Sequence, residues 1–251
     1  LMPKRNLLYL HSYTSDKHIV CHGVDFKGFL SCLENPPKNI LLVKGGHAGQ
    51  SLHNQSGFKY VGSSEINKLK AENINRYGDF CWVDFEDEFA LDQLTRLDIA
   101  ELLFFGHKRR PFSAPAFTRL QNRFAYWSHN DGWLTKVYFT DGGELRSFIS
   151  SAVSVFTSSK LTAGGKLPPD TAKEIVGFSE NGLLIDGGEL FDAGEMLMLP
   201  FYITGKITNM DDLLGNTTLY KMNAIKRGTL RFKKKDSENP LGFWRRRFPK
   251  K

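Results

Sequence analysis

The stretch FAYWSHNDGWLTKVYF, residues 124–139, decides the fold class of this chain. Two apolar and aromatic runs, Phe124–Ser128 and Trp133–Phe139, flank the turn His129–Gly132. The Asp-Gly pair of that turn supplies the positive φ that a tight hairpin requires. The stretch therefore predicts an antiparallel β-hairpin, which favours an α+β fold over a purely parallel α/β sheet.

Upstream of the hairpin, short apolar runs lead through a polar residue into helical patterns. Residues 19–24, followed by Asp25 as a capping residue and by apolar positions at helical spacing, predict a strand that runs into a helix. Phe80–Val83 predicts a second strand. After it we expect a single helix with acidic residues in its first turn, basic residues in its last turn and Gly106 as a stop signal.

Downstream of the hairpin, helices and strands alternate less regularly. Asp141 and the two glycines after it predict the start of a helix, and Asn209 is a predicted helix cap. The Ser-, Gly- and Pro-rich residues 158–170 predict a mobile segment. Three further runs predict strands: Glu174–Phe178, Gly182–Ile185 and Met196–Thr204.

The sequence thus predicts one α+β domain over residues 1–220, with amphipathic helices packed on a mixed, largely antiparallel sheet. Residues 221–251 form a separate tail of different composition. Twelve of the 34 basic residues lie in this tail beside only two acidic ones, which gives it a net charge of +10. Residues 1–220 carry 22 basic and 25 acidic side chains, so the basic character of the chain belongs to its tail.

Composition excludes several protein classes. The most apolar runs are far shorter than the ~20 residues that cross a bilayer. The three cysteines, Cys21, Cys32 and Cys81, are an odd number without C-x-x-C spacing, which argues against a disulfide framework and a zinc ribbon. We therefore expect a cytoplasmic protein with free, buried thiols and no transmembrane segment.

Four segments resemble those of an uncharacterised family of soluble bacterial proteins, some of which carry the transporter name oxalate:formate antiporter. The resemblance covers roughly residues 7–215 and implies a shared fold without assigned chemistry or catalytic residues. Because no stretch of this chain is long enough to span a bilayer, the transporter name does not fit it. The segments are Gly78–Glu86, Glu101–His107, Asn122–Tyr126 and Asp131–Trp133.

His129 and Asp131, between Trp127 and Trp133, form the best candidate for an enzyme site. A histidine on an aromatic-flanked hairpin can act as a proton shuttle. The polarity expected of a hairpin turn explains the same residues without chemistry, and we favour that interpretation.

Asp84 begins a group of acidic residues that can in principle pair for acid–base work or bind a divalent cation. Acidic residues at a helix start are the commoner explanation. His18 and His22 have the spacing of metal ligands only on a helix, and the residues between them favour a strand. We therefore predict no metal site.

No cofactor motif is complete in the sequence. The glycine-rich runs at 45–49 and 164–166 lack the spacing of dinucleotide and phosphate loops. Ser179 is one residue away from the spacing of a nucleophile elbow, and we expect a hairpin turn there. We therefore predict no cofactor.

The tail is the strongest candidate for a binding segment. Its aromatic residues alternate with cations, so stacking on bases could join contacts with phosphates. An anionic membrane surface is an alternative partner. If the tail has no binding function, we expect a solvated terminus in which Leu230–Phe232 is added to the sheet as an edge strand. The predicted nucleic-acid-binding residues are Arg231, Lys233, Lys234, Lys235, Trp244, Arg245, Arg246 and Arg247.

From the sequence we therefore expect a non-catalytic protein whose residues 221–251 bind a polyanion, with nucleic acid as the first choice. Two alternatives stay open. One is a small-molecule hydrolase or transferase with its site near His129 and Asp131. The other is a protein-interaction or immunity-type module that uses exposed aromatic side chains.

Overall fold

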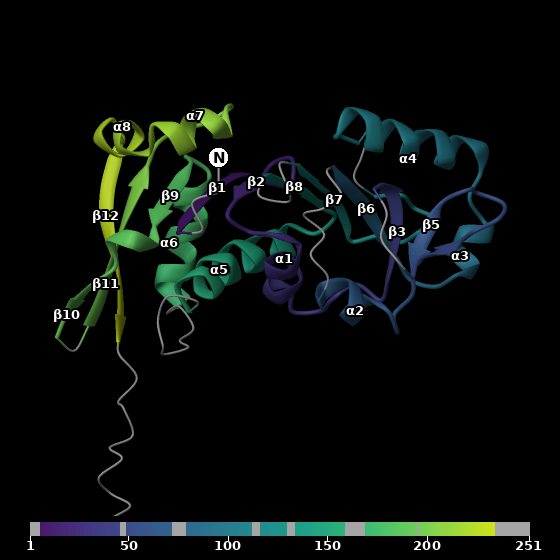
Figure 1. Cartoon of the computed structure of the whole chain (residues 1–251), viewed down its shortest axis with the longest axis horizontal. Helices are drawn as coiled ribbons and strands as arrows, with labels where there is room; N and C mark the ends of the chain where they lie inside the picture. Colours follow the sequence, from purple (N-terminus) through teal and green to yellow (C-terminus); the bar gives the residue numbers. More distant parts are fainter. Residues whose placement is uncertain are drawn as a thin grey trace, which may run out of the picture.

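A computed structural model describes residues 6–45, 49–71, 79–111, 116–129, 134–158, 169–194 and 196–233. The strands described in these ranges form one sheet of twelve strands (Figure 1). They are β1 (Leu7–Tyr13), β2 (His18–His22), β3 (Asn39–Lys44), β4 (Ser51–Leu52), β5 (Lys59–Val61), β6 (Phe80–Phe85), β7 (Phe124–His129), β8 (Leu134–Phe139), β9 (Leu183–Asp186), β10 (Phe191–Ala193), β11 (Met196–Ile203) and β12 (Lys226–Lys233).

The sheet has the order β10-β11-β9-β1-β2-β8-β7-β6-β3-β5-β4, and β12 pairs with the whole length of β11. Every ladder between the described strands is antiparallel. The predicted hairpin is present, with Phe124 opposite Phe139 and His129 opposite Leu134. The α+β fold expected from the sequence is therefore confirmed.

Eight α-helices accompany the sheet in the described ranges, together with a short 3-10 helix, η2 (Gly187–Glu189). Two of them confirm caps predicted from the sequence, because Asp25 accepts a hydrogen bond from the backbone of α1 and Asn209 from that of α7. The helices are α1 (Phe26–Cys32), α2 (Ile66–Ala71), α3 (Phe89–Asp92), α4 (Arg96–Lys108), α5 (Gly142–Ser158), α6 (Pro169–Ser179), α7 (Met210–Gly215) and α8 (Thr217–Met222).

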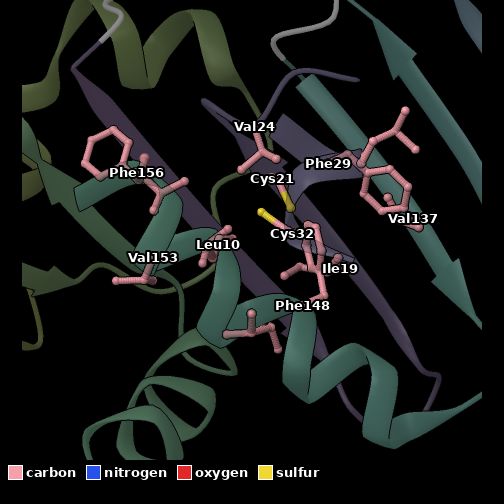
Figure 2. Close-up of a cluster of buried hydrophobic side chains, with 14 of the residues drawn as sticks. Leu10, Ile19, Cys21, Val24, Phe29, Cys32, Val137, Phe148, Val153 and Phe156 are labelled. Atoms are coloured by element: carbon pink, nitrogen blue, oxygen red, sulfur yellow. The ribbon is translucent and has the colours of Figure 1, made fainter. Parts of the chain in front are cut away.

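One face of the sheet is covered by α1, α5 and α6, which form the largest hydrophobic core with it (Figure 1). Figure 2 shows side chains of this core from strands and helices that are distant in sequence, among them Leu10, Val137 and Phe148. Cys21 and Cys32 lie in the same cluster, and all three cysteines are buried and free. Burial raises the pKa of the Cys32 thiol to about 12, so this thiol is unreactive at neutral pH.

The opposite face is covered only at its two ends. Helix α4 packs on β3, β6 and β7 and forms a second hydrophobic cluster around Phe105. Helix α7 packs near β1 and β9 and forms a third cluster around Met210 and Leu213. Between α7 and α4 on this side, Tyr138 of β8 packs against Phe105 of α4, whereas Tyr13, His18 and Lys136 stay partly exposed.

Two helix predictions were wrong in detail. The single helix expected after Phe80–Val83 is two helices, because Thr95 starts α4 with a capping box that it shares with Asp98. Gly106 is no stop signal but lies within α4, where a Cβ atom would come 2.7 Å from Val43. A glycine at this position lets α4 approach β3 closely.

The strand predicted at Glu174–Phe178 is also wrong, because these residues belong to α6. Ile175 of this helix is buried, and Ala172 and Val176 pack beside it against the core. Helical spacing of these three apolar residues outweighs the strand preference of the short run around Ile175. Residues 159–168 of the predicted mobile segment lie outside the described residues.

The predicted boundary at residue 220 falls inside α8, and the first part of the predicted tail is built into the sheet. Leu230 and Phe232 of β12 are buried in the main core, opposite Leu199 and Leu197 of β11. The edge strand considered as an alternative is therefore present, and it is longer than the three residues proposed from the sequence.

We expect Gly182→Ala to lower the free energy of unfolding by roughly 2 kcal/mol or more. Gly182 has φ +76°, and a Cβ atom there would lie 2.0 Å from the carbonyl oxygen of Gly205. That carbonyl cannot yield easily, because Gly205 donates a 2.9 Å hydrogen bond to Asn181. Urea denaturation measures the change.

Gly177→Ala is the matched control, since Gly177 lies in α6 with no atom within 4 Å of the added methyl. It should raise the free energy of unfolding by about 0.5–1 kcal/mol. Equal effects of the two substitutions would contradict the turn geometry.

Candidate functional site

His129 forms an acid–base pair with Asp79, fifty residues earlier in the chain. Phe80 of β6 lies opposite Ser128 of β7, so Asp79 and His129 face each other one position further along the same ladder. The Nδ1 atom of His129 is hydrogen-bonded to Oδ1 of Asp79. Strand pairing therefore brings the two side chains together.

Two cations bind the other carboxylate oxygen of Asp79. Lys44 Nζ lies 2.8 Å and the Arg109 guanidinium 3.0 Å from Oδ2. Burial alone would raise the pKa of Asp79. The hydrogen bonds from Lys44 and His129 and the charge of Arg109 outweigh that effect and lower the pKa to about 2. Asp79 is therefore a carboxylate throughout the physiological pH range.

Trp127 packs against both His129 and Arg109. Its indole ring stacks on the imidazole of His129 at a centroid distance of 5.7 Å, and the guanidinium carbon of Arg109 lies 4.8 Å from the indole centroid. Arg109 has φ +61°, an uncommon conformation for a residue other than glycine, directly after α4. The end of α4 thus places Arg109 between Asp79 and Trp127.

The arrangement fixes the tautomer of His129. Since the Asp79 carboxylate only accepts hydrogen bonds, the proton of a neutral imidazole must lie on Nδ1, which leaves a lone pair on Nε2. The His129 side chain is 41% exposed, and Nε2 has no hydrogen-bond partner among the residues described. An imidazole oriented by a carboxylate in this way can accept a proton from water or a hydroxyl group.

A second histidine–carboxylate pair in the chain shows the contrast. His53 Nε2 lies 2.9 Å from Asp92 Oδ1, and its Nδ1 accepts a hydrogen bond from the backbone N–H of Ser56. Both ring nitrogens of His53 are therefore used in holding the loop between β4 and β5. His129 differs from His53 in having a ring nitrogen left for chemistry.

The structure brings His129 together with Asp79, an acid that the sequence did not indicate as its partner. Asp131 lies outside the described residues. Lys44, Asp79 and Arg109 were not predicted as partners of His129, because they come from β3, the start of β6 and the end of α4. The pairing of β3 with β6 and the packing of α4 on β3 bring them together, and the sequence carries no direct signal of either.

Asp84 is a structural residue, and its interpretation as a helix-start acid is wrong. It lies inside β6, is 5% exposed, and accepts hydrogen bonds from the backbone N–H groups of Arg123 at 2.9 Å and Phe124 at 2.7 Å. Burial raises its pKa to about 7 although these hydrogen bonds oppose the shift. Because both hydrogen bonds come from backbone N–H groups at the start of β7, Asp84 holds this end of β7 beside β6.

The predicted nucleic-acid-binding residues are described only in part. Arg231 is exposed on β12, Lys233 ends that strand, and residues 234–251 lie outside the described residues. Arg227 is also exposed on β12, at a position that points to the same side of the strand as Arg231. The predicted residues outside the described part are Lys234, Lys235, Trp244, Arg245, Arg246 and Arg247.

No group of three or more His, Cys, Asp or Glu side chains that would suit a metal ion occurs within the described ranges. His18 and His22 lie on β2, as expected from the apolar residues between them. In the same ranges, no helix has the length and apolar character needed to cross a membrane.

Comparison of the chain with family models, with curated proteins and with solved structures finds no match. The resemblance to the bacterial family stays a prediction.

We expect Asp84→Asn to remove one component of the pH dependence of stability. The folded protein holds the Asp84 proton up to a pH of about 7, whereas the unfolded chain releases it near 3.8. Between these values the folded state binds more protons, so the contribution of Asp84 to the free energy of unfolding falls as the pH rises. Asparagine keeps an oxygen that can accept both backbone hydrogen bonds and cannot ionise.

The stability of Asp84→Asn relative to the wild type should therefore rise by on the order of a few kcal/mol between pH 4 and pH 8. Urea denaturation at a series of pH values measures this difference. Glu174→Gln is the control, since Glu174 is an exposed carboxyl group on α6. A constant difference between Asp84→Asn and wild type across the series would contradict the assignment.

Proposed function

We propose that this protein is an enzyme that acts on small molecules by proton transfer at Nε2 of His129, as a hydrolase or transferase. The observation that carries the proposal is the hydrogen bond between Nδ1 of His129 and Asp79. It sets the tautomer, orients the ring and stabilises the positive charge that the imidazole gains when it takes a proton.

Asp79 serves as the positioning residue of this pair. Its ionisation is maintained by Lys44 and Arg109, so it can stabilise an imidazolium without taking the proton itself. The cations also offset the carboxylate charge, which leaves the site favourable for a developing negative charge nearby. His129 would activate water in a hydrolase, or an acceptor hydroxyl group in a transferase.

Diethyl pyrocarbonate, which acylates the lone-pair nitrogen of neutral imidazole, provides a test that needs no substrate. We expect modification of His129 to be several-fold faster than modification of His53, measured by mass spectrometry of peptides. Asp79→Asn should slow the reaction at His129, because an asparagine can also donate a hydrogen bond to Nδ1 and so no longer fixes the lone pair on Nε2. Modification at His129 no faster than at His53, or unchanged in Asp79→Asn, would contradict the proposal.

A panel of p-nitrophenyl esters and phosphates then tests turnover. For a substrate that wild type hydrolyses, His129→Gln should lower the rate by roughly 10²–10⁴-fold. His53→Gln is the matched control, because it removes a histidine–carboxylate pair whose ring nitrogens are both occupied.

Polyanion binding by residues 221–251 is a second candidate function, and one observation favours it. β12, the first part of this segment, is an edge strand paired with β11, and Arg227 and Arg231 are exposed on it. Seven further basic residues follow within residues 234–251. Nucleic acid is the polyanion that we propose first, and an anionic membrane surface is the alternative.

A test of the tail must preserve β12. Removing everything after Tyr220 would expose the apolar residues of β11 that β12 covers, such as Leu199. A chain that ends at Lys233 keeps the whole strand. Loss of binding in that truncated chain would therefore show that residues 234–251 bind the polyanion, and it would not result from unfolding.

We expect the chain ending at Lys233 to bind short single- and double-stranded oligonucleotides more weakly than the full chain. The slope of log K against log salt should become less steep by roughly 0.7–0.9 for each phosphate that the shortened chain no longer binds. Arg227→Gln with Arg231→Gln should weaken binding further. The double variant Lys59→Gln with Lys68→Gln is the control, since it removes the same charge from the other end of the molecule. Affinity independent of the tail would contradict this candidate function, and binding to anionic vesicles alone would identify a membrane as the partner.

A further inference from the structure

Three cations gather on the part of the sheet between α7 and α4, where Tyr13, His18 and Lys136 are only half-buried. We call this surface the open face and define it by His11, Tyr13, His18, Lys136 and Tyr138, on β1, β2 and β8. Lys136 Nζ lies 4.9 Å from the ring centroid of Tyr138, and Lys206 Nζ lies 5.8 Å from that of Tyr13. Arg110, just after α4, is the third cation, close enough to influence the pKa values of Lys136 and Tyr138.

The three cations have no carboxylate partner among the described residues. No hydrogen bond or ion pair joins Lys136, Lys206 or Arg110 to an acidic side chain there, in contrast with Lys44, Arg109 and Lys221. Asp16, an exposed residue in the turn between β1 and β2, is an acid whose charge raises the pKa values of His18 and Tyr138. The open face therefore has an excess of positive charge.

This arrangement costs stability. Lys136 is half-buried, and its pKa is lowered by burial and by the charges of Arg110 and Lys206. Burial and the charge of Lys136 likewise lower the pKa of His18 to about 4. A half-buried lysine without a counter-charge is unfavourable for folding, and such groups cluster at functional sites.

The aromatic residues of the open face form a row of neighbouring rings, of which His11, Tyr13 and His18 are stacked and Tyr138 is tilted against His18. Ring centroids are 4.7 Å apart between His11 and Tyr13, 4.3 Å between Tyr13 and His18, and 5.0 Å between His18 and Tyr138. His11 and Tyr138 are buried in this row, whereas Tyr13 and His18 are partly exposed. A ligand on this surface would meet the ammonium groups of Lys136 and Lys206 beside the rings of Tyr13 and His18.

We propose that the open face is a binding site for the phosphate group of a small phosphorylated molecule. Several cations beside hydrogen-bond donors match a compact group that carries two charges and several acceptor oxygens. The bound phosphate would supply the counter-charge that Lys136, Lys206 and Arg110 lack within the described part of the chain.

The site is next to the His129–Asp79 pair but does not depend on it. Lys136 lies opposite Trp127 in the pairing of β7 with β8, and the indole ring of Trp127 stacks on the imidazole of His129. A phosphate held at Lys136 would thus place the rest of the molecule near Nε2 of His129. This inference goes beyond the proposed function, because the site can bind phosphate whether or not His129 transfers a proton.

Inorganic pyrophosphate is the probe, and the imidazole NMR signals of the full chain are the readout. We expect saturable shifts of the His11 and His18 signals. Their pKa values should rise on binding, since the anion offsets Lys206 beside His11 and Lys136 beside His18. The other groups that face these rings are Tyr9, Tyr13, Tyr138 and Asp16. Pyrophosphate bound elsewhere, for example by the tail, would leave the two signals unchanged.

Lys136→Gln and Lys206→Gln should each weaken binding by about tenfold, the loss expected when one charged contact is removed. Lys206 is exposed, so its variant tests the site even where Lys136→Gln perturbs the fold. Lys59→Gln, an exposed lysine on β5, is the control and should bind as wild type.

His129→Gln should retain the binding, which separates a failure of this inference from a failure of the proposed catalytic role. Absent shifts of His11 and His18, or wild-type affinity in both Lys136→Gln and Lys206→Gln, would overturn the inference. So would an oligonucleotide that shifts these signals where pyrophosphate does not, because that result would assign the surface to a polymer.

Discussion

The need to cover both faces of one long sheet shapes this molecule. Helices α1, α5 and α6 bury one face, where aromatic side chains such as Trp82 and Tyr126, stacked 5.0 Å apart, fill the space between strands and helices. Such burial is the main favourable contribution to folding. On the other face, α7 and α4 pack near the two ends, and Tyr13 and His18 between them are only partly buried. The rings of Tyr13 and His18 stack on each other, so each covers part of its neighbour.

Strand β1 joins the two halves of the sheet, because it pairs with β2 on one side and with β9 on the other. Its residue Tyr9 also binds the loop that follows β11. Its hydroxyl lies 3.0 Å from the carbonyl of Gly205 and accepts a hydrogen bond from Ile207 N–H at 2.9 Å. The same oxygen lies 3.1 Å from Nδ1 of His11. Because a phenol has a single proton and donates it to Gly205, His11 is the donor to Tyr9 when its proton lies on Nδ1. Tyr9 thus connects the loop that contains Lys206 with His11 of the open face.

Local features of this structure were predictable from the sequence, and pairings were not. The caps at Asp25 and Asn209 and the hairpin at residues 124–139 depend on neighbouring residues, so the sequence predicts them correctly. The strand predicted at Glu174–Phe178 failed because a short apolar run suits a strand and a buried helix face equally. The sequence pointed to Asp131 beside His129, a residue outside the described ranges, and did not indicate the described partner Asp79. A histidine on a strand meets residues of the adjacent strand, and their identity depends on a register that no local signal contains.

The unpartnered cations of the open face are the feature that folding explains least. At the position of Lys136, between Val20 on β2 and Trp127 on β7, a threonine or valine would satisfy the sheet without repulsion from Arg110 and Lys206. Asp79, by contrast, has its charge balanced by Lys44, Arg109 and His129, so that cluster stabilises itself. The two neighbouring sites therefore differ in what they lack. The His129 pair is electrostatically complete and has a ring nitrogen to use, while the open face is incomplete and becomes balanced only when an anion binds.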